Sequence, residues 1–511
     1  MKNIHQYKIL LLCFLMGAFF SCKREFIEEP IIGADLEANF YQTEEDFFQA
    51  LVATYDVMQW GGTKGRWTMK VGLLNTASDD CFAGGSNSTD QPSWVAYDQF
   101  SLDPFLGPQE GLWAKYFAGI YRANLLLTRI ENAEGVSADF KARVVAEAKF
   151  LRAFFYFDLV RFFKNVPLFT KELTPDDIGN VSQADPAEVF AQIEQDLQDA
   201  INTFELPETV TPDQLGRITK GAANALLGKV IMFQNDNSRM AEAAVYLEAV
   251  INTNLYDLEP EYGDIFKNAN EFGIESVFEV QYSDNRPGDF GGGFVAGATQ
   301  NPTEGNFNVQ FFGMRDYSGE TYAPGWGFCP ITNDLVDFMS GDPRFEHTVI
   351  DGKLLKLQGS EYTPGFQNTD YFIKKYAPLE ELQATDGVIA LSWSNNVREI
   401  RYADVLLLAA EALVRGGGDA GTARGYVNKV RQRVSLQPFP GSVNGEQLLN
   451  LIARERRMEL ATEGHRFFDL IRTDKAAETL EGFQTGVHEI LPIFQTEIDL
   501  AEGRLIQNSG Y

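Results

Sequence analysis

The sequence has little positive charge for its length. Its 511 residues include 43 Lys and Arg against 72 Asp and Glu, which gives a formal net charge of −29 at pH 7. Proteins that bind nucleic acid neutralise phosphates with clustered basic side chains, and docking on anionic lipid by charge needs the same clusters. We therefore exclude both kinds of binding and expect an acidic, soluble surface.

Histidine and cysteine are also scarce, with four of each in the chain. No His-Glu-x-x-His motif or Cys/His cluster is present, so the sequence does not support a zinc site. It also contains no Gly-x-Ser-x-Gly nucleophile elbow and no Gly-x-x-x-x-Gly-Lys-Ser/Thr phosphate loop. We expect no cofactor, no metal and no catalytic residue.

Only one long apolar run is present, from Ile9 to Phe20, and it follows Lys2 and Lys8. A run of twelve residues rises about 18 Å as a helix, which is too short for a hydrocarbon core of roughly 30 Å. The pattern is typical of a secretory signal rather than of an anchor helix.

Cys22 follows this run after Ser21 and resembles the cysteine of a bacterial lipobox, which becomes the lipidated N-terminus after cleavage. We predict a signal peptide over residues 1–21 and a lipid-anchored tail over 22–42. A simple cleaved signal with an incidental cysteine is the alternative. Beyond the signal, Cys81 and Cys329 can bridge in an exported chain, but the sequence does not decide whether they do.

Paired amphipathic helices recur along the rest of the chain. Residues 222–251 align without gaps with residues 402–431, and small side chains match in the two copies, as at Ala223 and Ala403. Small side chains let two helices approach closely, as in tetratricopeptide units. Each copy therefore predicts a helical hairpin. The apolar spacing predicts two further hairpins, 43–59 with 110–131 and 140–163 with 186–203.

The stretch "AKFLRAFFYFDLVRFFKNVPLF" (148–169) contains eight aromatic side chains. Five charges within sixteen of its residues exclude a membrane-spanning helix. On a helical wheel, Leu151, Phe155, Leu159 and Phe162 form an apolar stripe, and most other positions are apolar too. We predict a buried core helix whose Arg and Lys stems reach out to solvent, rather than a platform for a ligand.

Two stretches, 60–108 and 284–398, have a different composition. They are rich in Gly, Asn, Pro, Ser and Trp and show little helical period, whereas "ESVFEVQYS" (275–283) predicts a short strand. Long irregular insertions in a rigid frame are where binding residues usually lie. We expect a ligand site in these two stretches.

Five stretches of the chain, in order, resemble the SusD/RagB family. They are "FLRAFFYFDLVRFFKNVPL", "IRYADVLLLAAEALVRGG" (400–417), "YVNKVRQR" (426–433), "IARERRMELATEGHRFFDLIR" (452–472) and "LPIFQTEIDLAEGRLIQNSGY" (491–511). Two small departures occur in the last stretch, where Phe494 replaces the usual Pro and Ala-Glu-Gly replaces Asn-Pro.

The resemblance implies a mainly α fold of tetratricopeptide-like hairpins with a loop-rich, irregular part packed alongside, in one domain over residues 43–511. It also implies an outer-membrane lipoprotein that faces the cell exterior and caps a SusC-like TonB-dependent transporter. Such proteins capture a nutrient, most often a glycan, without cofactor or catalysis. A peptide-capturing protein of the same architecture and a surface glycoside hydrolase are the alternatives.

Sugar binding needs flat apolar faces for C–H groups together with polar groups for hydroxyls. The two irregular stretches supply both, and the resemblance implies a glycan site built from these regions. Phe82 and the glycines after it depart from starch-binding relatives, so the resemblance does not carry over a substrate. The candidate residues are Arg66, Trp67, Asp79, Asp80, Phe82, Trp94, Tyr322 and Trp326.

Three other polar features have structural interpretations. A glycosidase needs two carboxyl groups that face each other across about 5 to 9 Å, so we expect the adjacent Asp79 and Asp80 to bond a turn or sugar hydroxyls instead. We expect "RERR" (454–457) to form ion pairs within the frame, and His465 to be a structural histidine.

Overall fold

The structure is a computed structural model that describes residues 40–174, 177, 180–284, 304–385 and 387–511. The predicted signal peptide, Cys22 and most of the predicted tail lie outside the described residues, as do residues 285–303 of the second irregular stretch. In the described ranges, no helix is both long enough and apolar enough to cross a bilayer.

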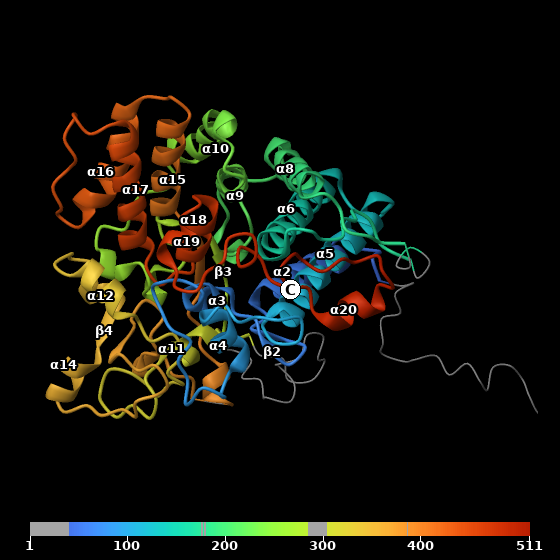
Figure 1. Ribbon diagram of the computed structural model, residues 1–511. Coiled ribbons are helices and arrows are strands. Elements are labelled where there is room, and N and C mark those ends of the chain that lie inside the picture. The colour runs from blue at the N-terminus through green and yellow to red at the C-terminus, as the bar shows by residue number, and fades with distance from the viewer. Residues whose placement is uncertain (1–39, 175–176, 178–179, 285–303, 386) are drawn as a thin grey trace, which may run out of the picture.

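Most of the long helices lie in the upper part of the molecule in Figure 1, and most of the short helices lie in the lower part. The long helices are α2 (Glu44–Gln59), α5 (Gln109–Glu131), α6 (Ala138–Phe163), α8 (Pro186–Asn202), α9 (Lys220–Phe233), α10 (Met240–Asn252), α15 (Tyr402–Arg415), α16 (Ala420–Arg433) and α17 (Gly445–Leu460). The short helices are α3 (Lys70–Thr76), α4 (Pro92–Asp98), α11 (Phe307–Phe312), α12 (Asn333–Met339), α13 (Phe345–Thr348), α14 (Gly352–Leu357), α18 (Arg466–Arg472), α19 (Ala476–Thr479) and α20 (Gln495–Leu500). The strands are β1 (Gly62–Thr63), β2 (Arg66–Trp67), β3 (Ser276–Val280), β4 (Val349–Asp351), β5 (Tyr371–Ile373) and β6 (Val397–Arg401).

The long helices form antiparallel pairs that stack on one another. Helix α2 packs against α5, α6 against α8, α9 against α10 and α15 against α16, so the four predicted hairpins are confirmed. The stack is continuous, because α5 also contacts α6, α8 contacts α9, and α10 contacts α15 across a gap of 149 intervening residues, 253–401. The chain therefore has the mainly α fold that the sequence predicts.

Local sequence signals fix where several helices begin. At the start of α2, Thr43 and Asp46 form a capping box, in which each side chain accepts a hydrogen bond from the other residue's backbone amide. Asp185 and Glu188 do the same for α8, and Pro186 occupies its first turn. These caps satisfy amide groups that have no partner within the helix, and proline at this position loses no hydrogen bond.

Helix α6 contains most of the aromatic run and lies in the core. The Phe155 and Phe162 side chains are no more than 1% exposed, and the Phe162 ring lies 6.2 Å from that of Tyr116 and 5.3 Å from that of Phe468. The prediction of a core helix is confirmed. One detail differs, because Arg152 does not reach solvent. It is 4% exposed and donates to Asp196 of α8 at 2.7 Å, so an ion pair rather than water satisfies the buried guanidinium.

The predicted strand at 275–283 forms β3, which pairs antiparallel with β6. Ser276 lies opposite Arg401, and Val280 lies opposite Val397. Because β6 leads directly into α15, this two-stranded sheet connects the irregular part of the chain to the helical stack.

A cluster of buried charges lies at the same junction, and we refer to it as the buried ion cluster. Arg401 donates to Glu275 and Glu459 at 2.6 Å and to both carboxylate oxygens of Glu463 at 2.8 Å. Lys375, from the irregular part, donates to Glu463 at 2.7 Å. The remaining members, which lie in the same network, are Arg344, Arg433 and Glu455. All of these side chains are at most 4% exposed, so each charge depends on its partners in place of water.

Candidate functional site

Trp67 is positioned by a tight hairpin. Strands β1 and β2 pair with Gly62 opposite Trp67, and the two residues between them, Lys64 and Gly65, have φ angles of 53° and 70°. Two consecutive positive φ angles are typical of the two-residue turns that match the twist of paired strands. Gly65 adopts this conformation without strain. The hairpin therefore holds Trp67 at a fixed place beside α11.

Trp326 reaches the same place from the second irregular stretch. Its backbone N–H donates to the Gln310 carbonyl oxygen at 2.8 Å, and the Gly325 N–H donates to Met314 at 2.8 Å. The backbones approach so closely that a Cβ atom on Gly325 would lie 2.3 Å from the Gly313 Cα. Only glycine fits there, so the segment before Trp326 is fixed against the end of α11.

Trp67 and Trp326 are in contact, and we call them the aromatic pair. Their ring centroids lie 5.8 Å apart at an interplanar angle of 63°, and both side chains are half-buried. Phe311 of α11 contacts both rings, at 4.9 Å from Trp67 and 5.1 Å from Trp326. Two candidates, one from each irregular stretch, thus form one partly exposed aromatic surface.

The sequence analysis did not identify the phenylalanines that support the pair. Phe307 and Phe311 both contact Trp67 from successive turns of α11. The signal for them is their spacing of four residues, which places two side chains on the same face of a helix. Because α11 has only six residues, it carries no longer apolar period that could have marked it.

Trp94 lies beneath the aromatic pair rather than beside it. The side chain is completely buried, and its ring lies 5.0 Å from that of Phe311 and 5.7 Å from that of Phe328. A ligand has no access to a ring at this depth, so Trp94 supports the site from the core.

Three further candidates lie apart from the two tryptophans. Arg66 precedes Trp67 on β2 and contacts Glu110 at 3.4 Å, on the other face of the strand. Tyr322 is 6% exposed and packs against Tyr317 at 5.7 Å, and burial raises its pKa to about 12. Phe82 is half-buried, and its backbone N–H donates to the Pro330 carbonyl oxygen at 3.0 Å.

Asp79 and Asp80 face arginine side chains. Arg466 donates to both oxygens of Asp79, at 2.8 and 2.9 Å, and Arg457 donates to Asp80 at 3.0 Å. Burial opposes ionisation of both carboxyls. The hydrogen bonds and charge of Arg466 nevertheless lower the pKa of Asp79, whereas burial prevails at the more enclosed Asp80 and raises its pKa. Both carboxyls thus take part in ion pairs within the fold.

The "RERR" segment forms the ion pairs that were predicted for it. Arg456 donates to Asp404 at 2.8 Å and to Asp469 at 3.1 Å, and Arg457 contacts Asp80. His465 is half-buried between these groups, and burial lowers its pKa to about 4, so the imidazole is neutral at pH 7. Within the described ranges, no group of three or more His, Cys, Asp or Glu side chains is placed to hold a metal ion.

The two cysteines beyond the signal peptide are both buried and unbridged. The Cys329 Sγ lies 3.4 Å from the Thr76 Oγ1, and burial raises the pKa of this thiol to about 12. The sequence did not decide whether Cys81 and Cys329 form a disulfide, and in the structure they do not.

The stacked hairpins and the aromatic pair define a helical-repeat protein with a half-exposed aromatic site outside its repeats. Two family models match the chain: the SusD family over residues 356–511, and a family described as starch-binding and associating with the outer membrane over residues 57–232. The chain belongs to the SusD/RagB family.

Relatives of known structure cover nearly the whole chain. A laminarin-binding SusD-like protein is 39% identical, with a TM-score of 0.84 over 92% of this chain and 100% of its own. Surface glycan-binding protein A from Bacteroides thetaiotaomicron, solved with laminarihexaose, is 31% identical, with a TM-score of 0.82 over 91% and 100%. A relative found by sequence, SusD-like protein P25 from Formosa agariphila, is 24% identical over 91% of this chain and 89% of its own.

Proposed function

We propose that this chain is a cell-surface lipoprotein that captures a glycan and delivers it to a partner TonB-dependent transporter barrel. Laminarin and its oligosaccharides are the proposed ligands. The observation that carries the proposal is the aromatic pair, which presents two tryptophan side chains at the surface of the irregular part. Flat aromatic faces cover the C–H groups of a sugar ring, and neighbouring polar groups bond its hydroxyls.

The choice of ligand is supported by the relatives. Two similar structures name laminarin or laminarihexaose, and both are more than 30% identical to this chain. We propose no catalytic role, because Asp79 and Asp80 are bonded to Arg466 and Arg457 and are not set opposite each other across an open cleft.

Binding is tested with purified protein that lacks residues 1–22, using laminarin in affinity gels and laminarihexaose in calorimetry. Replacing Trp326 by Ala is expected to weaken binding by about tenfold or more, because one stacked ring is typically worth about 1 to 3 kcal/mol. Tyr121→Ala, which removes an aromatic ring that is 46% exposed on α5, is the matched control. Equal affinities for the two variants would place the glycan elsewhere, and release of reducing sugar would end the proposal of a pure binder.

Anchoring and delivery are tested separately in cells. Cys22→Ala is expected to move the protein from the membrane fraction to the soluble fraction, because lipidation needs the thiol. A tag at the C-terminus is expected to recover a large outer-membrane barrel protein from detergent extracts. A variant that stays with the membrane contradicts the lipid anchor, and recovery without a barrel contradicts the partner.

A further inference from the structure

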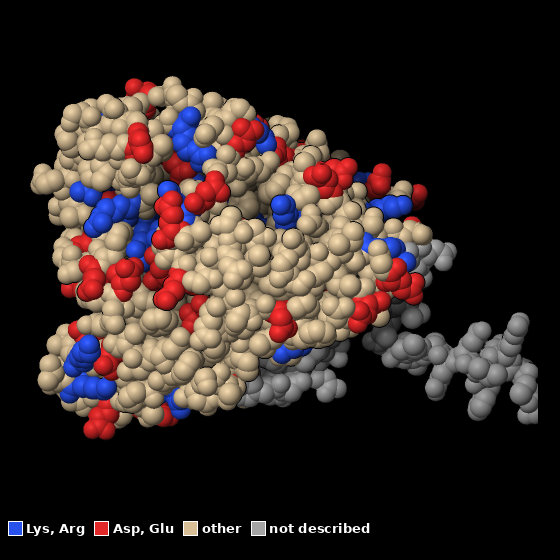
Figure 2. All heavy atoms as spheres, viewed as in Figure 1, with Lys and Arg blue, Asp and Glu red and all other residues tan. Residues whose placement is uncertain are grey.

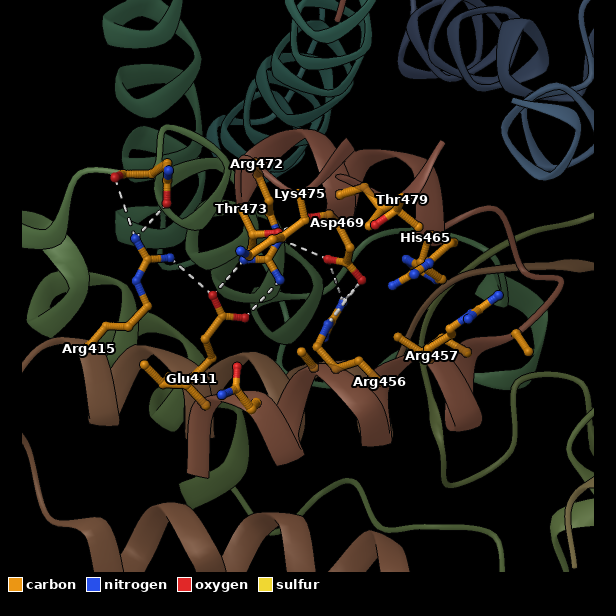
Figure 3. A pocket seen from close by; sticks show the side chains of 18 of the residues that line it. Glu411, Arg415, Arg456, Arg457, His465, Asp469, Arg472, Thr473, Lys475 and Thr479 are labelled. Atoms are coloured by element: carbon orange, nitrogen blue, oxygen red, sulfur yellow. Dashed lines mark hydrogen bonds and ion pairs between the residues drawn. The ribbon is translucent and has the colours of Figure 1, made fainter. Parts of the chain in front are cut away.

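A cavity of about 560 Å³ opens between α15, α17, α18 and α19, apart from β2, which carries Trp67, and from α11, which supports the aromatic pair. Figure 3 shows its lining, and Figure 2 shows Lys and Arg side chains among Asp and Glu over the same helices. The volume lies within the range of pockets that hold small molecules.

The lining of the cavity is rich in cationic side chains, each of which pairs with a carboxylate at or behind the wall. Six cationic side chains line it, against three carboxylates, although the whole chain carries a net charge of −29. In Figure 3, Glu411 lies between Arg415 and Arg472, and Asp469 faces Arg456. These carboxylates hold the guanidinium groups in place at the wall. The cationic residues are Arg415, Arg456, Arg457, Arg466, Arg472 and Lys475.

One end of the cavity retains unused hydrogen-bonding groups. The Nε and Nη2 of Arg466 donate to Asp79, the Nε of Arg457 donates to Asp80, and its Nη2 donates to Asp334. Among the described residues, the Nη1 of each arginine has no hydrogen-bond acceptor. Asp80 is completely buried, and its Oδ2 accepts no hydrogen bond. In the described part of the chain, one donor of each arginine is therefore without a protein acceptor at this end of the cavity.

Apolar side chains also line the cavity, beside the arginines. Leu449, Ala453 and Leu460 lie on α17, the helix of Arg456 and Arg457, and Leu470 lies on α18. Apolar side chains next to guanidinium groups fit a ligand that has both C–H groups and an anionic group. Guanidinium groups bind planar or tetrahedral anions through paired hydrogen bonds.

We propose that this cavity is a second ligand site, which binds a small sugar carrying an anionic group, either a carboxylate or a sulfate ester. Arg457 and Arg466 bond the anionic group, and α17 covers the C–H face. Lys475, at the rim, adds a screened charge. The site is separate from the aromatic pair, so an experiment that disproves anion binding here leaves the proposed glycan function intact.

The test compares four probes on the wild-type protein by calorimetry: glucuronate, glucose 6-sulfate, glucose and inorganic sulfate. We expect glucuronate or glucose 6-sulfate to bind at least about tenfold more tightly than glucose, because a hydrogen bond to a charged group is stronger than one to a neutral group. The tighter of the two anionic sugars identifies the anionic group. Equal binding of glucose overturns the proposal, as does inorganic sulfate that binds as tightly as the anionic sugars.

Variants locate the site. Arg466→Gln is expected to weaken binding of the anionic sugar by about tenfold, and Lys475→Gln by about twofold. Lys267→Gln is the matched control, because Lys267 and Lys475 are both exposed and both pair with a carboxylate three residues away. Lys475→Gln and Trp326→Ala keep the test decisive if Arg466→Gln does not fold. The proposal fails if Lys475→Gln behaves like Lys267→Gln, or if Trp326→Ala abolishes binding of the anionic sugar.

Discussion

Replacing Glu463 by Gln tests whether the buried ion cluster stabilises the fold. Glu463 is bonded by Arg401 and Lys375 and is completely buried. Burial alone would raise its pKa, but the two cations prevail and lower the pKa from 4.5 to about 2. Because one pKa unit corresponds to about 1.4 kcal/mol, this difference is worth about 3 kcal/mol of folding free energy. Breaking a buried pair by removing one partner has a similar measured cost of about 3 to 5 kcal/mol.

The sign of the pH dependence follows from the direction of the shift. A carboxyl whose pKa is lower in the folded state contributes fully above its unfolded value of 4.5 and loses that contribution as the pH falls to about 2. The free energy of unfolding of Glu463→Gln should therefore lie about 3 kcal/mol below that of the wild type at pH 7. The difference should shrink steadily between pH 4.5 and pH 2.

Urea denaturation followed by far-UV circular dichroism measures this difference at each pH. Glu478→Gln is the matched control, because Glu478 is exposed and forms an ion pair with Lys475, three residues away. Its removal is expected to cost less than about 0.5 kcal/mol. The reasoning is refuted if the two variants are equally stable at pH 7, or if the deficit of Glu463→Gln stays constant as the solution is acidified.

Three further predictions concern the core, the thiols and the site. Phe155→Ala should lower the free energy of unfolding by about 3 to 5 kcal/mol in urea titrations, since the ring is completely buried against Gly119. A smaller loss than that of the Phe204→Ala control, at an exposed ring, would contradict the placement of α6 in the core. In the folded protein lacking residues 1–22, a thiol reagent at pH 8 should label neither Cys81 nor Cys329, because both thiols are buried and burial raises the pKa of Cys329 to about 12. In urea the reagent should label both cysteines. If neither is labelled in urea without reductant, the two cysteines form a disulfide. Gly325→Ala should weaken laminarihexaose binding more than Gly441→Ala does. Of these two substitutions, only the one at Gly325 would make the new Cβ collide with backbone, 2.3 Å from Gly313. Equal affinities of the two variants would show that laminarihexaose binding does not depend on the position of Trp326.

The helical hairpins could be predicted because their signals are local. Apolar spacing and capping residues lie within each segment, and the helix bounds agree with the predicted ranges to within two residues at 140–163 and 186–203. The strand at 276–280 was also predicted from its own residues. Its partner β6 was not, because pairing across more than a hundred residues leaves no local signal.

The candidate site could be predicted only in part. Composition identified Trp67 and Trp326, but their contact depends on the close approach of Gly313 and Gly325, which no pattern revealed. Asp79 and Asp80 were grouped with the tryptophans because they lie in the first irregular stretch and carboxylates can bond sugar hydroxyls. In the structure they pair with Arg457 of α17 and with Arg466 of α18, which packs against α3.

The direct contact between α10 and α15 has a consequence for how this protein can change over evolution. The chain leaves the helical stack after Asn252 and returns to it at Tyr402, and the rings of Tyr256 and Tyr402 stack 6.4 Å apart. The intervening segment, which carries Trp326, thus begins and ends at almost the same place. Such a segment is a natural unit of exchange. Another sequence with the same two ends can replace it and alter the range of ligands while the stacked helices keep their arrangement.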